Sequence, residues 1–566
     1  MKNKSILPLD KKDQQFSSIN ITLKILIILV ILANSVGMFF PSLSSTFTPY
    51  YASIAKHMLL SNNWTDLILS GHDWLDKPHL PFWLTALSFK LFGISSFAYI
   101  LPGFLFNLIG IYFTYKLAKY WYSEEVGLLA ALFTLSALHI MLSSIDVRAE
   151  AYLLGEIMPA CYYWLLYDQQ AKLKYLVLGA IFTALAMMTK GIFTLITIGS
   201  GIIVLWMYHG QWRNFMRMKW LAALLLSFLL IAPELYALYQ QFDLHPEKIM
   251  FGQNHVSGIR WFFWDSQFGR FFNTGPIMST NPPPFHYLYF VYTFFWAYLP
   301  WWPMFIAAVW SSCKGLVKQD THRDASVYLL ASFFITFVLF SITTFQVDHY
   351  TNILFPFASI LGANWFINIY NQVRRPVMYY IELSIAIILL LIVLSISWIV
   401  LSGISLVIIL SLIGISCCSL IWLRYQTWGI KTIIYPSIAI SMAFIFAMFA
   451  NGISYAKYDA GYQIANYLNK NVQGQVIGYQ IDMLSLDLHS QNPYMLQDNL
   501  QGVKQQPKPF YLVTKVSNQE VIEIQFPQAL IVGTFAGGSI ETFIANIINL
   551  KQLQSKLTNY IVIKVD

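Results

Sequence analysis

Thirteen stretches of about twenty predominantly apolar residues divide this sequence, and each is long enough to cross the hydrocarbon core of a bilayer as a helix. Hydrophobic residues make up 57% of the chain and charged residues only 11%, which lies outside the range of soluble globular proteins. We therefore predict a polytopic α-helical membrane protein with about 13 transmembrane helices. The stretches centre near residues 31, 105, 133, 158, 180, 199, 228, 300, 334, 358, 388, 413 and 441.

The connections between these stretches alternate in charge. Every even-numbered connection carries Lys or Arg, as at Lys116 and Lys119 or at Arg213, Arg217 and Lys219. Basic connections stay in the cytoplasm, so the odd-numbered connections and the segment after the last stretch are predicted on the outer side. The net charge of +8 comes from these scattered positions, and no nucleic-acid partner is expected. The four Cys residues lie in or beside apolar stretches without metal-ligand spacing, so neither a disulfide framework nor a metal site is expected.

The character of the chain changes at about residue 453. Residues 475–479, 509–514, 529–533 and 560–564 have the pattern of strands, and residues 459–469, 518–524 and 541–553 that of helices. A small α/β domain is expected from such a mixture. We predict two domains, a transmembrane domain over residues 1–452 and an outer, periplasmic α/β domain over residues 453–566.

The first outer loop, residues 43–83, is neither a short turn nor an apolar span. Its residues 50–60 place apolar side chains at helical spacing, with Lys56 and His57 on the other side, which predicts an amphipathic helix in the membrane interface. Asp76-Lys77-Pro78 follows, close to where the chain re-enters the lipid. Charges at such a place are expensive to keep unless they bind something, although a solvated loop ended by proline is an equal alternative.

Unusual polar residues collect in the other outer connections as well. Asp146, Arg148 and Glu150 lie between the third and fourth stretches. In an extended segment all three charges would share one face, whereas on a helix the two carboxylates would. A second long loop, residues 240–285, is also expected to carry interfacial helices. Cations there suit a phosphate, and carboxylates suit a general base, whereas a single charge at a span end can also be a snorkelling anchor. The polar residues of the later connections are His255, Arg260, Asp265, Arg270, Asp348 and His349.

Several sequence runs occur together in a fixed order. They are YYASIAKHML from Tyr50, DKPHLPFWLTALSFKLFGISSFAYILPG from Asp76, LAMMTKGIFTL around Lys190, FGRFFNTG around Arg270, YLPWWPMF from Tyr298 and HYTNILFPFASILGA from His349. Together they resemble the glycosyltransferases of GT-C type that use lipid-linked sugars, within the group of the aminoarabinose lipid A transferases and the protein O-mannosyltransferases. The resemblance covers roughly residues 25–370 and implies thirteen spans with an outer α/β domain.

The resemblance implies a donor site for a polyprenyl-phosphate sugar. Lys77 and Arg270 would hold the phosphate leaving group, with Lys190, Arg148 and Tyr51 beside them. Residues assigned to the acceptor side or the site lining are His255, Asp348 and His349. No cofactor is implied beyond, at most, a divalent cation.

The catalytic carboxylate is less well defined. Members of the family have Asp-Glu just before the first outer helix, where this chain has Phe47-Thr48. Another carboxylate must then deprotonate the acceptor, and we rank Glu150 first, Asp146 second and Asp76 third.

Together these features predict a multi-pass protein of the bacterial inner membrane with its active site and C-terminus in the periplasm. Its partners would be an undecaprenyl-phosphate sugar donor, an acceptor in the outer leaflet and the surrounding lipids. The expected reaction moves an amino sugar from undecaprenyl phosphate to lipid A. The alternatives are protein O-glycosylation, a transporter of lipid-linked sugars and a catalytically degenerate homologue. No inverted repeat supports the transporter.

Overall fold

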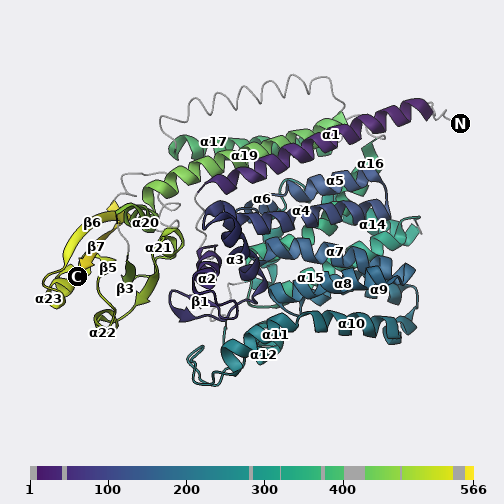
Figure 1. Ribbon diagram of the computed structural model, residues 1–566. Helices are drawn as coiled ribbons and strands as arrows, with labels where there is room; N and C mark the ends of the chain where they lie inside the picture. The colour runs from purple at the N-terminus through teal and green to yellow at the C-terminus, as the bar shows by residue number, and fades with distance from the viewer. Residues whose placement is uncertain are drawn as a thin grey trace.

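A computed structural model describes most of the chain as one long helical bundle with a small sheet at one end (Figure 1). The predicted span near residue 413, the helical pattern over residues 541–553, and Phe47 lie outside the described residues. The described residues are 9–40, 48–278, 285–318, 320–370, 377–400, 428–471, 474–538 and 555–566.

Helix α7 (Ala149–Gln170) forms the centre of the bundle. Every residue from Ala149 to Cys161 is buried, Glu150 and Glu156 included, as expected for a mainly apolar helix at the centre of a bundle. Helix α4 (Ser96–Trp121) packs along one side of α7 and α8 (Leu173–Lys190) along another. Farther out, α1 (Leu9–Ser35) and α17 (Val377–Val400) both lie against α19 (Trp428–Tyr458) (Figure 1).

The remaining helices of the bundle complete the layers around this centre. They are α5 (Glu124–Leu135), α6 (Leu138–Ser143), α9 (Thr194–Tyr208), α10 (Met218–Leu230), α13 (Tyr289–Ala297), α14 (Trp302–Lys318), α15 (Arg323–Ile342) and α16 (Phe355–Tyr370). Of the described helices, six are long and apolar enough to cross a membrane, or seven if the bent pair Met218–Leu230 and Ala232–Asp243 counts as one span. The protein is therefore a multi-pass membrane protein, and the count of thirteen spans remains a prediction.

Two of the predicted spans are interrupted. In the stretch centred on residue 300, one helix ends at Ala297 and the next begins at Trp302, because Pro300 has no N–H for a helical hydrogen bond. The stretch centred on residue 133 is also divided, since α5 ends at Leu135 and α6 starts at Leu138. The average hydrophobicity of a sequence stretch does not reveal such breaks. The breaks place polar side chains inside the bundle.

The C-terminal strands form one mixed sheet of five strands in the order β4-β3-β5-β7-β6. Strand β3 pairs in parallel with β4 and β5, whereas β7 runs antiparallel to β5 and β6. Four of these strands lie where the sequence pattern predicts strands, and β4 is additional. The boundary predicted at residue 453 falls inside α19, which continues to Tyr458. The strands are β3 (Gln475–Tyr479), β4 (Tyr494–Gln497), β5 (Phe510–Lys515), β6 (Leu530–Gly537) and β7 (Thr558–Val565), and the helices among them are α20 (Ala460–Asn471), α21 (Leu484–His489), α22 (Leu500–Lys504) and α23 (Gln519–Gln525).

The first outer loop lies between the bundle and this sheet (Figure 1). It consists of α2 (Thr48–Ser61), the short strands β1 (Ile68–Leu69) and β2 (His72–Asp73), and α3 (Leu80–Phe92). The expectation that α2 presents Lys56 outward at a membrane interface is wrong, because Lys56 is only 1% exposed and contacts Asp487 of α21. The polar side of this helix therefore faces protein.

Candidate active site

The motif Asp76-Lys77-Pro78 lies in the short segment between β2 and α3. Its neighbour His79 is buried and holds the segment in place. The ring Nδ1 of His79 lies 3.0 Å from Glu234 in α11 (Ala232–Leu238), and its backbone N–H donates to the same carboxylate over 2.9 Å. The alternative of a solvated loop is therefore wrong, since the motif is fixed against α11.

Asp76 joins two cations from different outer loops. Its carboxylate lies 2.5 Å from the Lys77 ammonium and also pairs with Arg270, which follows helix η4 (Trp261–Gly269). Burial by itself would raise the pKa of Asp76, but Lys77 and Arg270 reverse the shift and hold this pKa well below its usual range. Burial lowers the pKa of Lys77 to about 8, and the attraction of Asp76 offsets that only in part. Two cations thus share one carboxylate, which leaves the group net positive.

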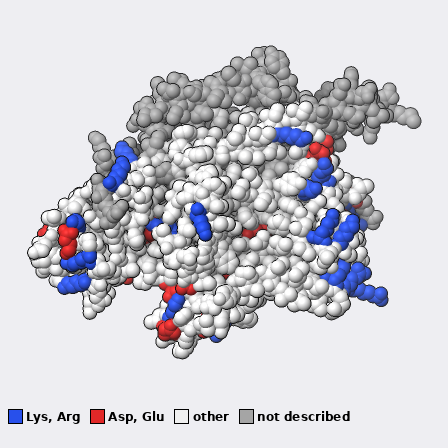
Figure 2. Space-filling view, viewed as in Figure 1, with Lys and Arg blue, Asp and Glu red and all other residues white. Residues whose placement is uncertain are grey.

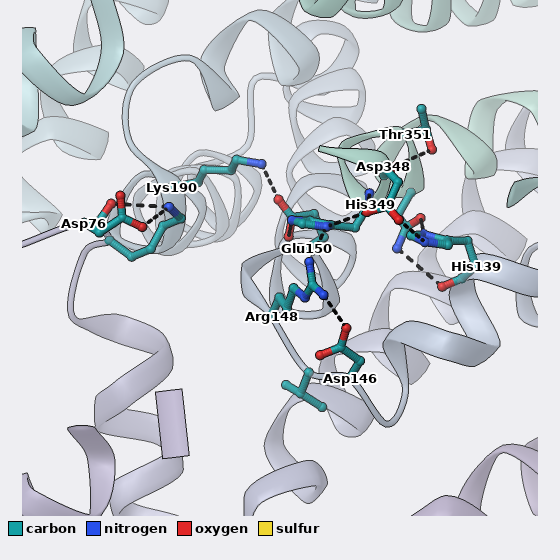
Figure 3. Close-up of polar contacts among 12 residues, drawn as sticks. Asp76, His139, Asp146, Arg148, Glu150, Lys190, Asp348, His349 and Thr351 are labelled. Carbon is teal, nitrogen blue, oxygen red and sulfur yellow. Dashed lines mark hydrogen bonds and ion pairs between the residues drawn. The ribbon is translucent and has the colours of Figure 1, made fainter. Parts of the chain in front are cut away.

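Glu150, at the start of α7, is the centre of a second charged group (Figure 3). Its carboxylate pairs with Lys190 at the end of α8 and lies 3.3 Å from Nε2 of His349. The Lys190 ammonium also lies 3.5 Å above the ring of Tyr350, a cation–π contact. In Figure 3, Lys190 lies between Asp76 and Glu150, and it lines the same cavity as Asp76.

The end of α8 is shaped to hold Lys190. The amide of Gln267 donates to the Lys190 carbonyl over 3.1 Å. This contact requires glycine at residue 191, where φ is +99° and a Cβ atom would come within 2.1 Å of the Gln267 side chain. The second outer loop therefore orients both Arg270 and the end of α8.

Asp146 does not lie on the same helix face as Glu150. Helix α7 begins at Ala149, and Arg148 before it is extended at φ −125° and ψ −175°. Asp146 instead pairs with Arg148 over 2.6 Å, and Arg148 donates to Nδ1 of His349 over 2.8 Å. The expectation that the carboxylates of Asp146 and Glu150 share one helix face is therefore wrong. Arg148 nevertheless links them through His349 (Figure 3).

His139 and Asn352 belong to the site, although no sequence motif singles them out. His139 in α6 lies 3.7 Å from Asp348 and 2.6 Å from the side-chain oxygen of Asn352. Both residues are buried, and His139 lies beside Asp348 and His349 (Figure 3). The only sequence signal was a polar residue inside an apolar stretch, which is as common for a satisfied core side chain.

Tyr51 contributes to the site from α2. Its side chain is 5% exposed and packs on Phe82, with ring centroids 4.9 Å apart. Burial, and then the negative charges of Glu150 and Asp76, raise the pKa of Tyr51 well above its usual value. Its hydroxyl is therefore neutral and lies within electrostatic reach of both carboxylates.

A cavity of about 100 Å³ opens beside the two charged groups. Its charged lining is Asp76, Lys77, Lys190 and Arg270, and most of the remaining lining is apolar, with hydroxyl and amide side chains from α9 and η4 among it. Glu150 is 2% exposed and lies behind Lys190 instead of lining the cavity. A cavity with several cations on one side and hydrocarbon on the other fits an anionic head group with an apolar tail.

The structure does not bring His255 to this cavity. His255 lies in the exposed segment before α12 (Gly258–Arg260), with φ at +59°, and its backbone N–H donates to Pro246. Arg260 and Asp265 pair with each other at 3.6 Å, and Arg260 is 73% exposed. Among the described residues, no three His, Cys, Asp or Glu side chains are grouped so that they could hold a metal ion.

Comparison with known proteins adds to this geometry. The sequence model of the dolichyl-phosphate-mannose-protein mannosyltransferase family matches residues 76–236, which include Asp76, Lys77, Glu150 and Lys190. The structure resembles that of ArnT from Cupriavidus metallidurans bound to undecaprenyl phosphate, with a TM-score of 0.70 at 15% identity over 97% of this chain and 98% of that one. This chain has the GT-C fold. The resemblance predicted from the sequence motifs is confirmed.

Two curated proteins match part of this chain at low identity. An uncharacterized protein of Aquifex aeolicus is 24% identical over 322 residues, which is 56% of this chain and 58% of that protein. Undecaprenyl phosphate-alpha-4-amino-4-deoxy-L-arabinose arabinosyl transferase 2 of Proteus mirabilis is 23% identical over 308 residues, which is 53% of this chain and 51% of that one. The chain thus spans a little over half the length of the curated relatives it matches.

Proposed function

We propose that this protein is a glycosyltransferase that moves a sugar from undecaprenyl phosphate to lipid A. The observation that carries the proposal is the pair Lys77 and Arg270 at a cavity whose remaining lining is mainly apolar. A polyprenyl-phosphate sugar has the matching parts, an anionic phosphate and a hydrocarbon tail. The resemblance to a structure bound to undecaprenyl phosphate supports this donor, and the name of the Proteus mirabilis relative supports an amino sugar.

In this proposal Glu150 accepts the proton of the acceptor as the sugar is transferred. His349, 3.3 Å from Glu150, and Arg148 behind it would keep the carboxylate oriented. Lys77 and Arg270 would stabilise the charge that develops on the departing phosphate. For this step Lys190 must move away from Glu150 toward the phosphate, so that Glu150 becomes accessible to the acceptor. Such a rearrangement is in keeping with catalytic contacts that commonly tighten only in the substrate complex.

The proposal is tested by mass spectrometry of lipid A from a strain without this protein. We expect the loss of one species that carries an added amino-sugar mass, and its return with the wild-type gene but not with Lys77→Ala. Unchanged lipid A together with lost sugar masses on proteins would instead establish protein O-glycosylation. The family model that matches residues 76–236 carries that second activity in its description.

We further propose that the cavity and the C-terminal sheet face the periplasm from the bacterial inner membrane. Figure 2 shows many Lys and Arg side chains at the bundle end farthest from the sheet, the distribution expected of a cytoplasmic end. A reporter enzyme that works only outside the cytoplasm, fused after Asp566, should be active. Activity of a cytoplasm-only reporter at that position would reverse the orientation.

Binding of the carrier should weaken as the pH rises through about 8. The pKa of Lys77 is lowered to about 8, so the ammonium that attracts the phosphate is present below this pH and lost above it. A bound phosphate favours the charged form, and the binding constant should fall by up to about tenfold per pH unit above the pKa of Lys77. Binding of undecaprenyl phosphate would be measured from about pH 7 to about pH 10, where its own charge has become constant.

The matched variant for this measurement is Lys77→Arg. A guanidinium stays protonated over the whole range, so the variant should bind with little dependence on pH, whatever its absolute affinity. An equally steep dependence in Lys77→Arg would assign the titration to another group.

A further inference from the structure

A buried ion pair joins the first outer loop to the C-terminal sheet. Lys56 of α2 is 1% exposed and Asp487 of α21 is fully buried, and their charged atoms lie 3.5 Å apart. The Lys56 ammonium also donates to the backbone carbonyls of Asp487 and, over 2.7 Å, of Ser490. Ser53 donates to the other oxygen of the Asp487 carboxylate. These residues are more than 400 positions apart in sequence, so no local pattern could predict the contact.

The same helix supplies Tyr51 to the active site. Tyr51 and Lys56 are five positions apart, which puts them about 140° apart around the helix axis. Tyr51 therefore packs on Phe82 of α3, next to the Asp76-Lys77 segment in the chain, while Lys56 faces α21. Any shift of α2 relative to α21 would move Tyr51 with respect to Asp76 and Glu150.

A second contact reaches the segment that leads to Asp76. The Ser70 hydroxyl, between β1 and β2, donates to Asp482 over 3.1 Å, and the backbone N–H of Leu496 in β4 donates to the Ser70 carbonyl over 3.3 Å. The hairpin of β1 and β2 ends three residues before Asp76. The C-terminal unit thus contacts both α2, which carries Tyr51, and the hairpin that leads to the cavity residue Asp76.

The charges of Lys56 and Asp487 indicate a role other than stabilising the fold. Two buried charges lose their hydration, and replacing such a pair by apolar residues is often neutral for stability. The pair specifies one register of α2 against α21. Any other register would leave a buried charge without its partner, which is strongly disfavoured. An interface that only had to hold the two parts of the protein together could consist of apolar residues alone.

We propose that the C-terminal unit is a positioning element for the active site, holding Tyr51 and the Asp76-Lys77 segment in register through Lys56 and Asp487. The inference rests on the proposed function, because it assigns this unit a part in binding the polyprenyl-phosphate donor. The unit contributes no cavity residue of its own among those described. It acts through α2 and the hairpin.

The test measures binding of undecaprenyl phosphate to the full-length protein. Asp487→Asn keeps the shape of the side chain and removes its charge, and it should weaken binding by about tenfold. In a Tyr51→Phe background the same change should have a much smaller effect, since residues that act through one another are not additive. Lys564→Ala is the matched control, because Lys564 pairs with Asp566 at the surface of the same unit. Equal effects of Asp487→Asn in both backgrounds would overturn the positioning role.

Two further measurements keep the outcome decisive. If the single variants do not fold, Lys56→Met with Asp487→Leu leaves no unpaired buried charge, and normal binding by this double variant would overturn the proposal. Hydrogen exchange of the α2 amides should be faster in Asp487→Asn than in wild type, and unchanged exchange would also overturn it. The proposed function fails separately, if wild type and Lys77→Ala bind the lipid equally, and the exchange result still decides the role of α21.

Discussion

Replacing Glu150 by glutamine should abolish sugar transfer while leaving donor binding intact. Glutamine preserves the shape of Glu150 and can still accept from Lys190 and His349, but it cannot take a proton. A lost general base commonly reduces the rate by about 10²- to 10⁴-fold. The measurement is single-turnover transfer with saturating donor, together with binding of undecaprenyl phosphate to the same variant.

Two isosteric variants serve as controls for this result. Asp146→Asn should retain transfer, because Asp146 pairs with Arg148, and Arg148 in turn contacts His349. Asp76→Asn should weaken donor binding, since Asp76 holds Lys77 and Arg270 in place. Full activity of Glu150→Gln with an inactive Asp146→Asn would reverse the ranking of these two carboxylates. If both variants stay active, Asp76, which lines the cavity, becomes the base to test.

The helical architecture could be predicted from the sequence because lipid imposes a simple length rule on apolar stretches. The rule fails where a helix breaks without a change in hydrophobicity, as at Pro300, and it cannot tell a spanning helix from the short α5 and α6. The strands β3, β5, β6 and β7 were predictable from their apolar runs, whereas the four-residue β4 gave too short a signal.

The polar residues of the site could be predicted as a set but not as pairs. Asp76, Lys77, Glu150, Lys190, Arg270 and His349 were each singled out, and the structure brings them together beside one cavity. Their pairing depends on how separate loops meet, which no local spacing contains. The same holds for Lys56, whose place on the polar side of an amphipathic helix predicts a membrane interface, whereas the structure places it against Asp487.

The largest effect on the donor should come from removing a cation beside Asp76. Lys77, Arg270 and Asp76 together carry one net positive charge, and Lys190 is already balanced by Glu150. Lys77→Ala or Arg270→Ala leaves the group neutral and leaves Asp76 to compete with the phosphate for the remaining cation. Truncating one partner of a hydrogen-bonded charge pair commonly costs about 2–5 kcal/mol of binding, so the affinity for undecaprenyl phosphate should fall by roughly 30-fold or more.

A matched variant separates this effect from a general loss of outer-loop charge. Lys248 pairs with Asp73 over 2.8 Å, in the same outer loops but away from the cavity lining. Lys248→Ala should therefore bind undecaprenyl phosphate like wild type, while Lys77→Ala and Arg270→Ala lose most of their affinity and remain folded by thermal unfolding. Wild-type binding and transfer by either cavity variant would mean that its charge only anchors the loop at the membrane surface. Loss of binding in all three would point instead to the net field of the outer loops, and the donor phosphate would then have no specific site at Asp76.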